Sequence, residues 1–303
     1  MTDEVRTFAS MAVLIDGNSL AAQIREEVRE EVNVLASARG ITPGLNLLLV
    51  GEDPASAVYV RNKGKDCEKV GIHSTILRLP ETASEQEVLD VVHAWNADNS
   101  VHGILVQLPL PKHINEHRVI NTISPLKDVD GFHPENAGKV MIGLDGFIPC
   151  TPYGVLEMLR RYNIETSGKH AVIVGRSNIV GKPLSILLAQ KRTPGNATVT
   201  ICHTGTPDIA QYTRTADILI SAVGHHGVIT KDHVKPGAVV IDVGINRITL
   251  PDGTTKLVGD VLFDEVEPIA QAITPVPGGV GPMTRAMLLR NTLKAAQAVG
   301  GQL

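Results

Sequence analysis

A repeated alternation of short apolar runs with longer amphipathic segments constrains the fold of this chain more than any other feature. In the first half, apolar runs at residues 45–51, 74–79 and 101–108 are typical of buried strands, and the segments 56–71 and 83–98 between them have helical patterns. Strands joined through helices in this order form a mostly parallel sheet with right-handed crossovers. The sequence therefore predicts an α/β fold.

A second series of the same kind follows a predicted helix at residues 151–163. Its expected strands and its helix occupy residues 170–175, 182–191, 197–203, 216–224 and 237–244. Two such series are enough for two α/β domains of ordinary size.

The predicted domain boundaries lie where this rhythm changes. We expect a first domain at residues 1–150 and a second, Rossmann-like domain at residues 151–284, with a cleft between them. The last helix, within residues 285–303, is expected to pack back on the first domain.

The start of the chain has its own pattern. Residues 1 to about 11 are expected to form a disordered extension, and a helix over residues 17–40 follows, with Ser19 as its cap and Gly40 as its stop. The first residues include acids and do not form a charged-then-apolar leader, so we expect a cytoplasmic protein.

Composition excludes two classes of partner. The net charge is -4, and lysine and arginine are scattered along the chain, so there is no basic stripe for nucleic acid. The apolar runs are far shorter than the ~20 residues that a membrane span needs. We therefore expect neither a nucleic acid nor a membrane as a partner.

Cysteine and histidine give no sign of a metal site. Cys67, Cys150 and Cys202 are isolated and form no CxxC pair, which suits buried thiols in a reducing compartment. The histidines, including His102, His203, His225 and His226, show no spacing typical of metal ligands.

A glycine-containing loop stands between a predicted strand and a predicted helix in "AVIVGRSNIVGKPLSILL". At such a junction the free backbone N–H groups of a helix N-terminus can bind a pyrophosphate. The spacing from Gly175 to Gly181 is not the standard G-x-G-x-x-G, so a tight turn without any nucleotide is the alternative.

The end of the next strand indicates which dinucleotide would bind. An NAD enzyme commonly has an Asp or Glu there for the ribose hydroxyl, whereas this chain has His203 and Thr204. Without a carboxylate to repel a 2′-phosphate, and with Arg176 in the glycine loop, NADP is expected in preference to NAD. The alternative is that Arg176 is only a solvated loop residue.

Five polar residues of the first domain suggest chemistry. Tyr59 and Lys63 stand four residues apart on one face of a predicted helix, Gln107 ends a predicted strand, and Asp128 and Asp130 lie in the loop "KDVDGF". Each has a structural alternative, namely a surface pair, a strand-end residue that satisfies the backbone, and a turn residue before a glycine.

These segments, taken together, resemble the bifunctional methylenetetrahydrofolate dehydrogenase/cyclohydrolase family. The similarity covers nearly the whole chain in the family's order, and it includes the blocks "GILVQLPLP", "KDVDGF", "PENAGKV", "PCTPYGVLEML", "GRSNIVGKP", "ATVTICH", "DVGINR", "GDVLFDEV" and "PVPGGVGPMT". The resemblance implies NADP-dependent oxidation of 5,10-methylenetetrahydrofolate to the methenyl cation and its hydrolysis to 10-formyltetrahydrofolate. It also implies a homodimer, a catalytic first domain and a second domain that binds the dinucleotide.

The resemblance also implies roles for individual residues. Lys63 matches the family's essential lysine, Tyr59 the tyrosine that stacks on the p-aminobenzoyl ring, Gln107 the hydrogen-bond partner of the lysine, and Asp130 the carboxylate that holds the pterin. Further substrate contacts are implied on either side of Gln107 and in a folate loop: Val106, Leu108, Pro275, Val276, Pro277, Gly278, Gly279, Val280, Gly281, Pro282 and Met283. The implied NADP contacts are Gly175, Arg176, Ser177, Thr204 and Ile245.

The residue types fit this chemistry. Removal of a hydride creates a cationic one-carbon centre to which water must add, so a proton-shuttling group is needed near the ring nitrogens. A lysine can serve if its amine gives up its proton, and Gln107 and Tyr59 can orient it without adding charge.

Two departures from the family pattern bear on the cofactor. Thr204 stands where many members have serine, and the segment "QKRTPGNATV" is a few residues longer than usual, which could displace the contact at residue 204.

Two rival interpretations stay open at this point: a dehydrogenase without cyclohydrolase activity, and a non-catalytic nucleotide-binding module of the same fold. Retention of Lys63 and Gln107 argues against the first. The intact set of Tyr59, Lys63, Gln107 and Asp130 argues against the second.

Overall fold

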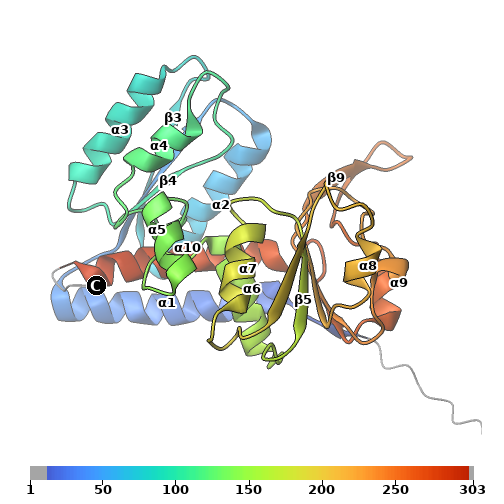
Figure 1. Ribbon diagram of the computed structural model, residues 1–303. Coiled ribbons are helices and arrows are strands. Elements are labelled where there is room, and N and C mark those ends of the chain that lie inside the picture. The colour runs from blue at the N-terminus through green and yellow to red at the C-terminus, as the bar shows by residue number, and fades with distance from the viewer. Residues whose placement is uncertain (1–11, 300–303) are drawn as a thin grey trace, which may run out of the picture. The chain divides into compact units, whose positions relative to one another are not determined.

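The computed structural model describes residues 12–299, which form two compact units (Figure 1). One unit contains residues 18–154 and 282–299, and the other contains residues 12–17 and 155–281. We call them the three-stranded unit and the six-stranded unit after their main sheets. The predicted extension at residues 1–11 lies outside the described residues.

The three-stranded unit is built on a parallel sheet with strand order β3-β2-β4 among the described residues. Strand β2 is central and buried along its length, because both of its edges are paired. The elements of this unit are α1 (Gly17–Arg39), β2 (Gly44–Val50), α2 (Pro54–Val70), β3 (His73–Leu79), α3 (Glu85–Ala97), β4 (Gly103–Val106), α4 (Glu116–Thr122), α5 (Pro134–Ile142), the start of α6 (Cys150–Arg161) and most of α10 (Val280–Ala298).

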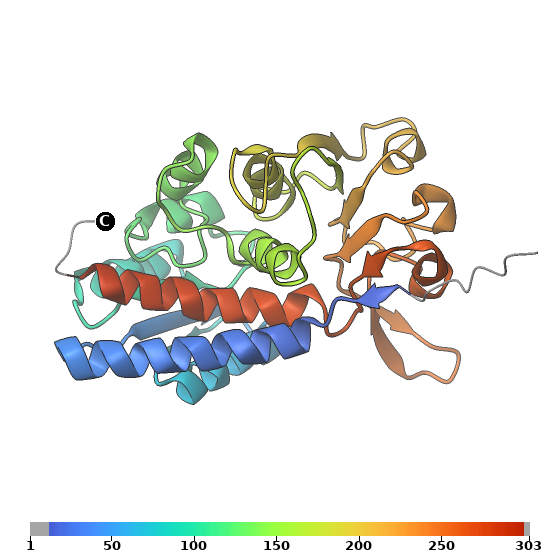
Figure 2. The ribbon, with the colours of Figure 1, turned by 90° about the horizontal axis from the view of Figure 1, so that it is seen from below.

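Helices α1 and α10 lie side by side in both ribbon views (Figures 1 and 2). Arg290 of α10 joins them, since its guanidinium lies 2.7 Å from a carboxylate oxygen of Glu27 and 2.6 Å from one of Glu31. The first and last described helices are therefore held together by charge-assisted pairs as well as by apolar packing.

The ends of these two helices differ in part from the prediction. Helix α1 stops at Arg39 before Gly40, as predicted, and Gly40 has a φ of 67°. Ser19 is not the cap, because the helix already begins at Gly17. Helix α10 begins at Val280 and not at 285, since a proline in the first turn of a helix, here Pro282, removes no helical hydrogen bond.

The six-stranded unit has a parallel sheet with strand order β1-β11-β8-β7-β5-β6 within residues 12–299. An antiparallel pair, β9 with β10, lies outside this sheet. The elements are β1 (Val13–Leu14), the remainder of α6, β5 (His170–Val174), α7 (Gly181–Ala189), β6 (Thr198–Cys202), α8 (Ala210–Thr213), β7 (Ile218–Ser221), the 3-10 helix η1 (Lys231–His233), β8 (Val239–Asp242), β9 (Asn246–Thr249), β10 (Thr255–Val258), α9 (Phe263–Val266), the 3-10 helix η2 (Glu267–Ile269) and β11 (Ala272–Ile273).

The strand order places a topological switch point at β5. The chain passes from β5 to β6 on one side and then to β7 on the other side of β5. In open parallel sheets, ligands bind outside the carboxyl ends of the strands at such a point. Here that position belongs to Gly175 and the residues that follow it.

The predicted α/β class and the predicted parallel sheets are confirmed, but several short elements were not foreseen. Residues 13 and 14 were expected in the first domain, whereas β1 pairs with β11, with Val13 opposite Ala272. The strand pair β9–β10 and the helices α4 and α5 were not predicted, because segments of four to nine residues show too little periodicity.

A buried polar network shapes the loop that carries Asp128. The carboxylate of Asp128 accepts hydrogen bonds from the backbone N–H groups of Phe132 (3.1 Å) and His133 (2.8 Å). Asn136, which is 1% exposed, donates to Asp128 and to the Pro125 carbonyl oxygen, each at 2.9 Å. Burial raises the pKa of Asp128 to about 6, and these donors act against the rise.

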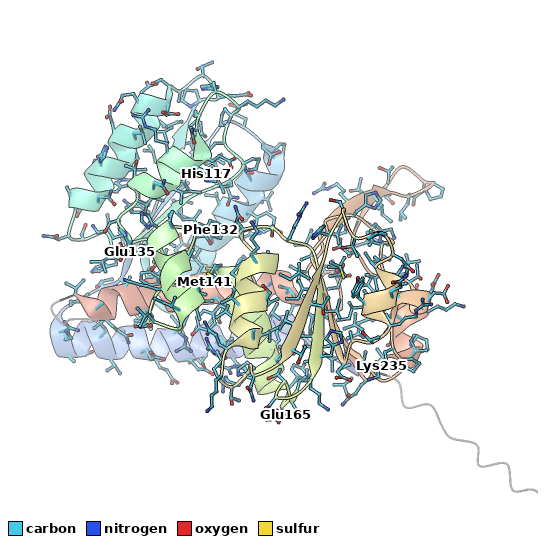
Figure 3. All side chains as sticks on the ribbon, in the orientation of Figure 1. His117, Phe132, Glu135, Met141, Glu165 and Lys235 are labelled. Carbon is cyan, nitrogen blue, oxygen red and sulfur yellow. The ribbon has the colours of Figure 1, made fainter. Side chains whose placement is uncertain are left out.

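Asn136 also accepts a hydrogen bond of 3.3 Å from the Phe147 N–H, so one amide joins three segments. Figure 3 labels two residues near the start of α5: Phe132 just before the helix and Glu135 in its first turn.

We predict that Asn136→Ala lowers the melting temperature by about 3–5 °C. The substitution leaves buried polar groups unpaired, which costs about 2–3 kcal/mol. The matched control is Glu135→Ala, which removes only an exposed ion pair with Lys139 and should change the melting temperature by about 1 °C. Thermal unfolding followed by circular dichroism tests this, and equal shifts for the two variants would contradict it.

Candidate functional site

Helix α2 positions the first two candidate residues. Its N-terminus is capped by Asp53, whose side chain accepts a hydrogen bond of 2.7 Å from the Ser56 N–H, and it ends before Gly71 in a left-handed conformation. Tyr59 and Lys63 lie one turn apart within this helix and therefore on one face of it.

Lys63 and Gln107 form a direct hydrogen bond. The Lys63 ammonium Nζ donates to Gln107 Oε1 at 3.0 Å. The Gln107 amide nitrogen donates to the Leu108 carbonyl oxygen at 2.8 Å, which turns the amide oxygen toward the lysine. The backbone N–H of Gln107 donates to the Leu48 carbonyl oxygen, so the sheet fixes the position of this residue.

Asp130 is half-buried in the same neighbourhood. Burial raises the pKa of its carboxyl group, and the positive charge of Lys63 and the Cys150 thiol lower it. Asp130 and Lys63 do not form a direct ion pair, so each side chain keeps room for other contacts. The predicted residues Lys63, Gln107 and Asp130 are thus brought together.

Tyr59 lies on the same face of α2 as Lys63, and it is close to Arg285, which was not predicted from the sequence. Tyr59 is 39% exposed. Partial burial raises the pKa of its hydroxyl group, and the positive charge of Arg285 reduces this rise. The Arg285 guanidinium lies 2.9 Å from a carboxylate oxygen of the buried Asp66, without the alignment of a hydrogen bond. Neither Asp66 nor Arg285 could be singled out from sequence, because they pair only through the contact of α2 with α10.

The predicted folate loop, residues 275–283, divides into a coil and a helical turn, since α10 begins at Val280. The coil is tightly packed: a Cβ on Gly279 would stand 2.5 Å from the Pro275 carbonyl oxygen. Met283 is buried, and so is Val106 at the end of β4. Met283, at 0% exposed, therefore presents neither its side chain nor its backbone to a ligand, and Val106, at 6%, presents almost nothing.

The glycines of the predicted cofactor loop are required by close backbone approaches. Gly175 has a φ of 128°, and a Cβ there would stand 2.3 Å from the Ala222 carbonyl oxygen. A Cβ on Gly181 would stand 2.1 Å from the Gly175 carbonyl oxygen. The two glycines of this loop therefore lie against each other.

Ser177 and Arg176 have different roles in this loop. The Ser177 hydroxyl accepts a hydrogen bond of 3.1 Å from the Val180 N–H and so closes the turn into α7. Arg176 is exposed and has no hydrogen bond or ion pair with any residue of the range 12–299. Its guanidinium is available to an anionic ligand.

Thr204 is exposed in the turn after β6. Cys202 is in register with Val174 of β5, and its carbonyl oxygen accepts a hydrogen bond of 2.8 Å from the Gly175 N–H. Ile245, the last predicted cofactor residue, is 46% exposed between β8 and β9. Gly175, Thr204 and Ile245 thus all follow the carboxyl ends of strands.

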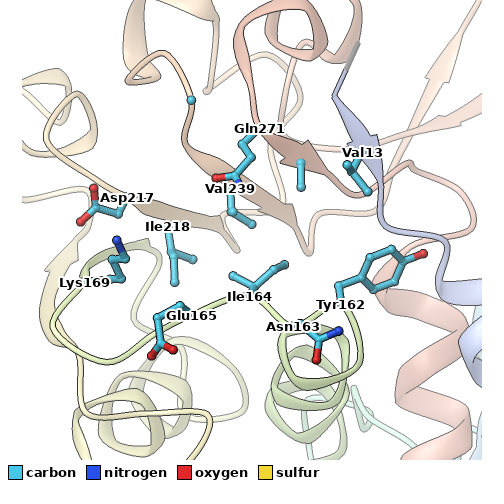
Figure 4. A pocket seen from close by; sticks show the side chains of 12 residues that line it. Val13, Tyr162, Asn163, Ile164, Glu165, Lys169, Asp217, Ile218, Val239 and Gln271 are labelled. Carbon is cyan, nitrogen blue, oxygen red and sulfur yellow. The ribbon is translucent and has the colours of Figure 1, made fainter. Parts of the chain in front are cut away.

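A cavity of about 340 Å³ lies at the opposite edge of the same sheet (Figure 4). It is lined where strands β7, β8 and β11 begin, by Ile218, Val239 and Ala272 among others. None of the predicted site residues lines it. Because ligands of open parallel sheets bind at the carboxyl ends, we do not assign the candidate site to this cavity.

Other features of the described residues bear on ligand classes. Cys67, Cys150 and Cys202 are buried free thiols, as predicted, and burial raises the pKa of Cys67 to about 12. Residues 12–299 contain no group of three or more His, Cys, Asp or Glu side chains that could hold a metal ion. In the same range, no helix has the length and apolar character that crossing a membrane requires.

Two family models match the chain. The model described as "Tetrahydrofolate dehydrogenase/cyclohydrolase, catalytic domain" matches residues 15–130. The model described as "Tetrahydrofolate dehydrogenase/cyclohydrolase, NAD(P)-binding domain" matches residues 149–299.

Individual proteins match over almost their full length. The bifunctional protein FolD of Chlorobium chlorochromatii is 54% identical, with 95% of this chain and 99% of that protein covered. The structure of the FolD enzyme from Campylobacter jejuni has 48% identity and a TM-score of 0.90, and covers 95% of this chain and 99% of that one. The Trypanosoma brucei methylenetetrahydrofolate dehydrogenase-cyclohydrolase, solved with NADP and an inhibitor, has 39% identity and a TM-score of 0.91, with 96% and 99% covered. With both halves matched in this way, the chain belongs to the tetrahydrofolate dehydrogenase/cyclohydrolase family.

Proposed function

We propose that the chain oxidises 5,10-methylenetetrahydrofolate with NADP and hydrolyses the methenyl product to 10-formyltetrahydrofolate. The observation that carries this proposal is the 3.0 Å hydrogen bond between Lys63 and Gln107, close to Asp130. The chain also has a glycine cradle, which we define as the close-packed loop from Gly175 to Gly181, and within it Arg176 has no partner among residues 12–299. The first group suits a folate and proton transfer, and the second suits a dinucleotide with a 2′-phosphate.

Each unit would supply one part of the reaction. We assign folate binding to the three-stranded unit, in line with the predicted domain at residues 1–150 and the returning helix at 285–303. NADP binding belongs to the six-stranded unit, in line with the predicted domain at 151–284. NADP, when bound, supplies the acceptor for the hydride that leaves the one-carbon unit.

Within the six-stranded unit, the residues fit NADP in three ways. At Gly175 and Gly181 the loop backbone passes close to the Ala222 and Gly175 carbonyl oxygens, where a side chain would block it. Arg176 has no partner among residues 12–299 and can pair with the 2′-phosphate. Thr204 adds a hydroxyl group and no negative charge.

Lys63 would move the protons of the hydrolytic step. Addition of water to the methenyl carbon forms a C–O bond and releases one proton, and ring opening moves another from the carbinol hydroxyl to the departing nitrogen. A neutral lysine amine can accept and return such protons. Gln107 Oε1 accepts an N–H of Lys63 in either protonation state, so it keeps the amine in place throughout.

Asp130 and Tyr59 would hold the folate. The Asp130 carboxylate can accept two aligned hydrogen bonds from the pterin amino and ring N–H groups. The exposed part of the Tyr59 ring can stack on the p-aminobenzoyl group. The coil at residues 275–279 and the helical turn that follows it would supply backbone contacts.

Two alternatives are less well supported. A dehydrogenase without cyclohydrolase activity would have no use for the formed Lys63–Gln107 pair. A non-catalytic nucleotide-binding module would need neither that pair nor Asp130.

We further propose a cytoplasmic homodimer. Buried free thiols suit a reducing compartment, and the dimer rests on the family resemblance. Sedimentation or light scattering of the purified chain tests the dimer.

Lys63→Met should lower cyclohydrolase activity by at least about 100-fold, because the proton shuttle is lost. NADP affinity should be unchanged, since the nucleotide residues lie in the other unit. The control is Lys65→Met, an exposed lysine of the same helix, which should keep full activity. Hydrolysis of methenyltetrahydrofolate is followed spectrophotometrically, and normal hydrolysis by the Lys63 variant refutes the role.

Asp130→Ala should weaken folate binding by about 2–3 kcal/mol, or roughly 30- to 150-fold in KM, if both hydrogen bonds to the pterin form. Steady-state kinetics with methylenetetrahydrofolate measures this. A normal folate KM with a lowered kcat would move Asp130 out of the pterin site.

Arg176→Ala should raise the KM for NADP roughly tenfold or more, the factor that ~1.4 kcal/mol implies, and leave NAD kinetics unchanged. Adding Thr204→Asp should then favour NAD, because an acid repels the 2′-phosphate and can bind the ribose hydroxyl. The control is Arg192→Ala, an exposed arginine of the long segment before β6. An equal effect of Arg176→Ala on both cofactors would make Arg176 a solvated loop residue only.

A further inference from the structure

Asp260 is a fully buried carboxylate with an unusual set of donors. It is 0% exposed and follows β10 in the sequence "GDVLF". From described residues its two oxygens accept five hydrogen bonds: from the Ser221 hydroxyl (3.1 Å), the N–H groups of Val223 (2.8 Å), Gly224 (3.2 Å) and His225 (3.0 Å), and the Asn246 side-chain amide (3.0 Å). Such a donor set compensates the burial of one negative charge.

Three of these donors lie in the loop after β7, and a fourth is the first residue of β9. The N–H groups of residues 223–225 directly follow β7, so they wrap around the carboxylate as consecutive donors. Asn246 opens β9, directly after the loop that follows β8. One side chain therefore fixes the loops after two neighbouring strands.

These loops stand next to the proposed NADP residues. The carbonyl oxygen of Ala222 is the atom that a Cβ on Gly175 would meet at 2.3 Å, so the loop after β7 is a wall of the glycine cradle. Ile245, a proposed nucleotide contact, immediately precedes Asn246 in the chain.

A second buried carboxylate holds Asp260 in place. Asp242, at the end of β8, accepts hydrogen bonds from the backbone N–H groups of Asp260 (3.0 Å), Val261 (2.9 Å) and Gly244 (2.9 Å). There is no spare room, because a Cβ on Gly259 would stand 1.8 Å from Asp242 Oδ2 and one on Gly244 would stand 2.0 Å from Asp260 Oδ1. Asp242, at the end of β8, thus fixes the backbone of Asp260 and with it the position of the Asp260 carboxylate.

We infer that Asp260 is a positioning residue of the NADP site, which it builds by holding residues 223–225 and Asn246 in the conformation that the nucleotide requires. It touches no reacting atom and acts through the loops. The inference rests on the proposed use of NADP, and it adds a residue that the motif of the glycine loop does not contain.

The test uses the two activities of one chain, only one of which needs the nucleotide. Asp260→Asn keeps the shape of the side chain, but both carboxylate oxygens face donors, so an amide NH₂ group on either side opposes N–H groups. We expect the KM for NADP to rise at least tenfold, while kcat/KM for hydrolysis of methenyltetrahydrofolate stays within twofold of wild type.

Two further variants separate positioning from general stability. Ser221→Ala removes a donor that lies within strand β7, whose backbone the ladder already fixes, so the KM for NADP should stay within twofold. Asn246→Ala releases one loop and keeps the carboxylate, so the KM for NADP should rise about threefold with hydrolysis unchanged. Melting temperatures of all variants are measured alongside.

The outcomes are distinct. If the wild-type chain shows no NADP-dependent oxidation, the proposed function is wrong. If the wild type is active and the Asp260→Asn variant has an unchanged KM for NADP, the inference is wrong. Equal losses of oxidation and hydrolysis in that variant would also overturn it, because they would indicate a general structural role. If Asp260→Asn does not fold, Asn246→Ala decides, and an unchanged KM for NADP there overturns the inference.

Discussion

The ladders of the two parallel sheets are the constraint on which the candidate sites depend. A parallel strand presents its last residue and the loop beyond it at one edge, and the register of the ladder fixes how far each loop extends. Gln107 is placed by its backbone bond to Leu48, and Gly175 by its bond to Cys202. Helix α2 places Lys63 next to Gln107, and the pairing of β4 with β2 fixes the position of Gln107. A slip of one residue in either sheet would reverse the side-chain directions along the strand and separate these groups.

The chemistry of the proposed hydrolytic step depends on the absence of a direct ion pair between Lys63 and Asp130. A lysine paired with a carboxylate would hold its proton, because losing it would leave the carboxylate uncompensated. The neutral Gln107 amide instead accepts a hydrogen bond of 3.0 Å from the lysine whether or not it is charged. The carboxylate of Asp130 remains in the neighbourhood as a separate group that can bind the substrate. In the proposed mechanism, one charged side chain moves protons while another holds the ring.

Sequence predicted the architecture well and its connections poorly. The long alternation of apolar and amphipathic segments was enough for the α/β class, which is confirmed, because each such segment carries its own period. The prediction of Ser19 as a cap was wrong, because the packing of Gly17 against the Gly279 carbonyl is not visible in a local pattern. The predicted start of the last helix was also wrong, because the helix includes Pro282 in its first turn. The contacts of Asp242 and Asp260 join segments far apart in the chain, so no spacing could have pointed to them. The site roles, drawn from the family resemblance, stay predictions.

The freedom of Arg176 has a consequence for how such an enzyme can change. Its side chain has no partner among residues 12–299, and Thr204 likewise bonds to nothing there, so neither side chain contributes to the stability of the sheet edge. The glycines and buried carboxylates around them are held by tight contacts and cannot vary so freely. We therefore expect the proposed preference for NADP to change with little effect on the free energy of unfolding of the chain without ligand. Descendants of this chain could exchange one dinucleotide for the other through surface substitutions alone, without any compensating change in the core.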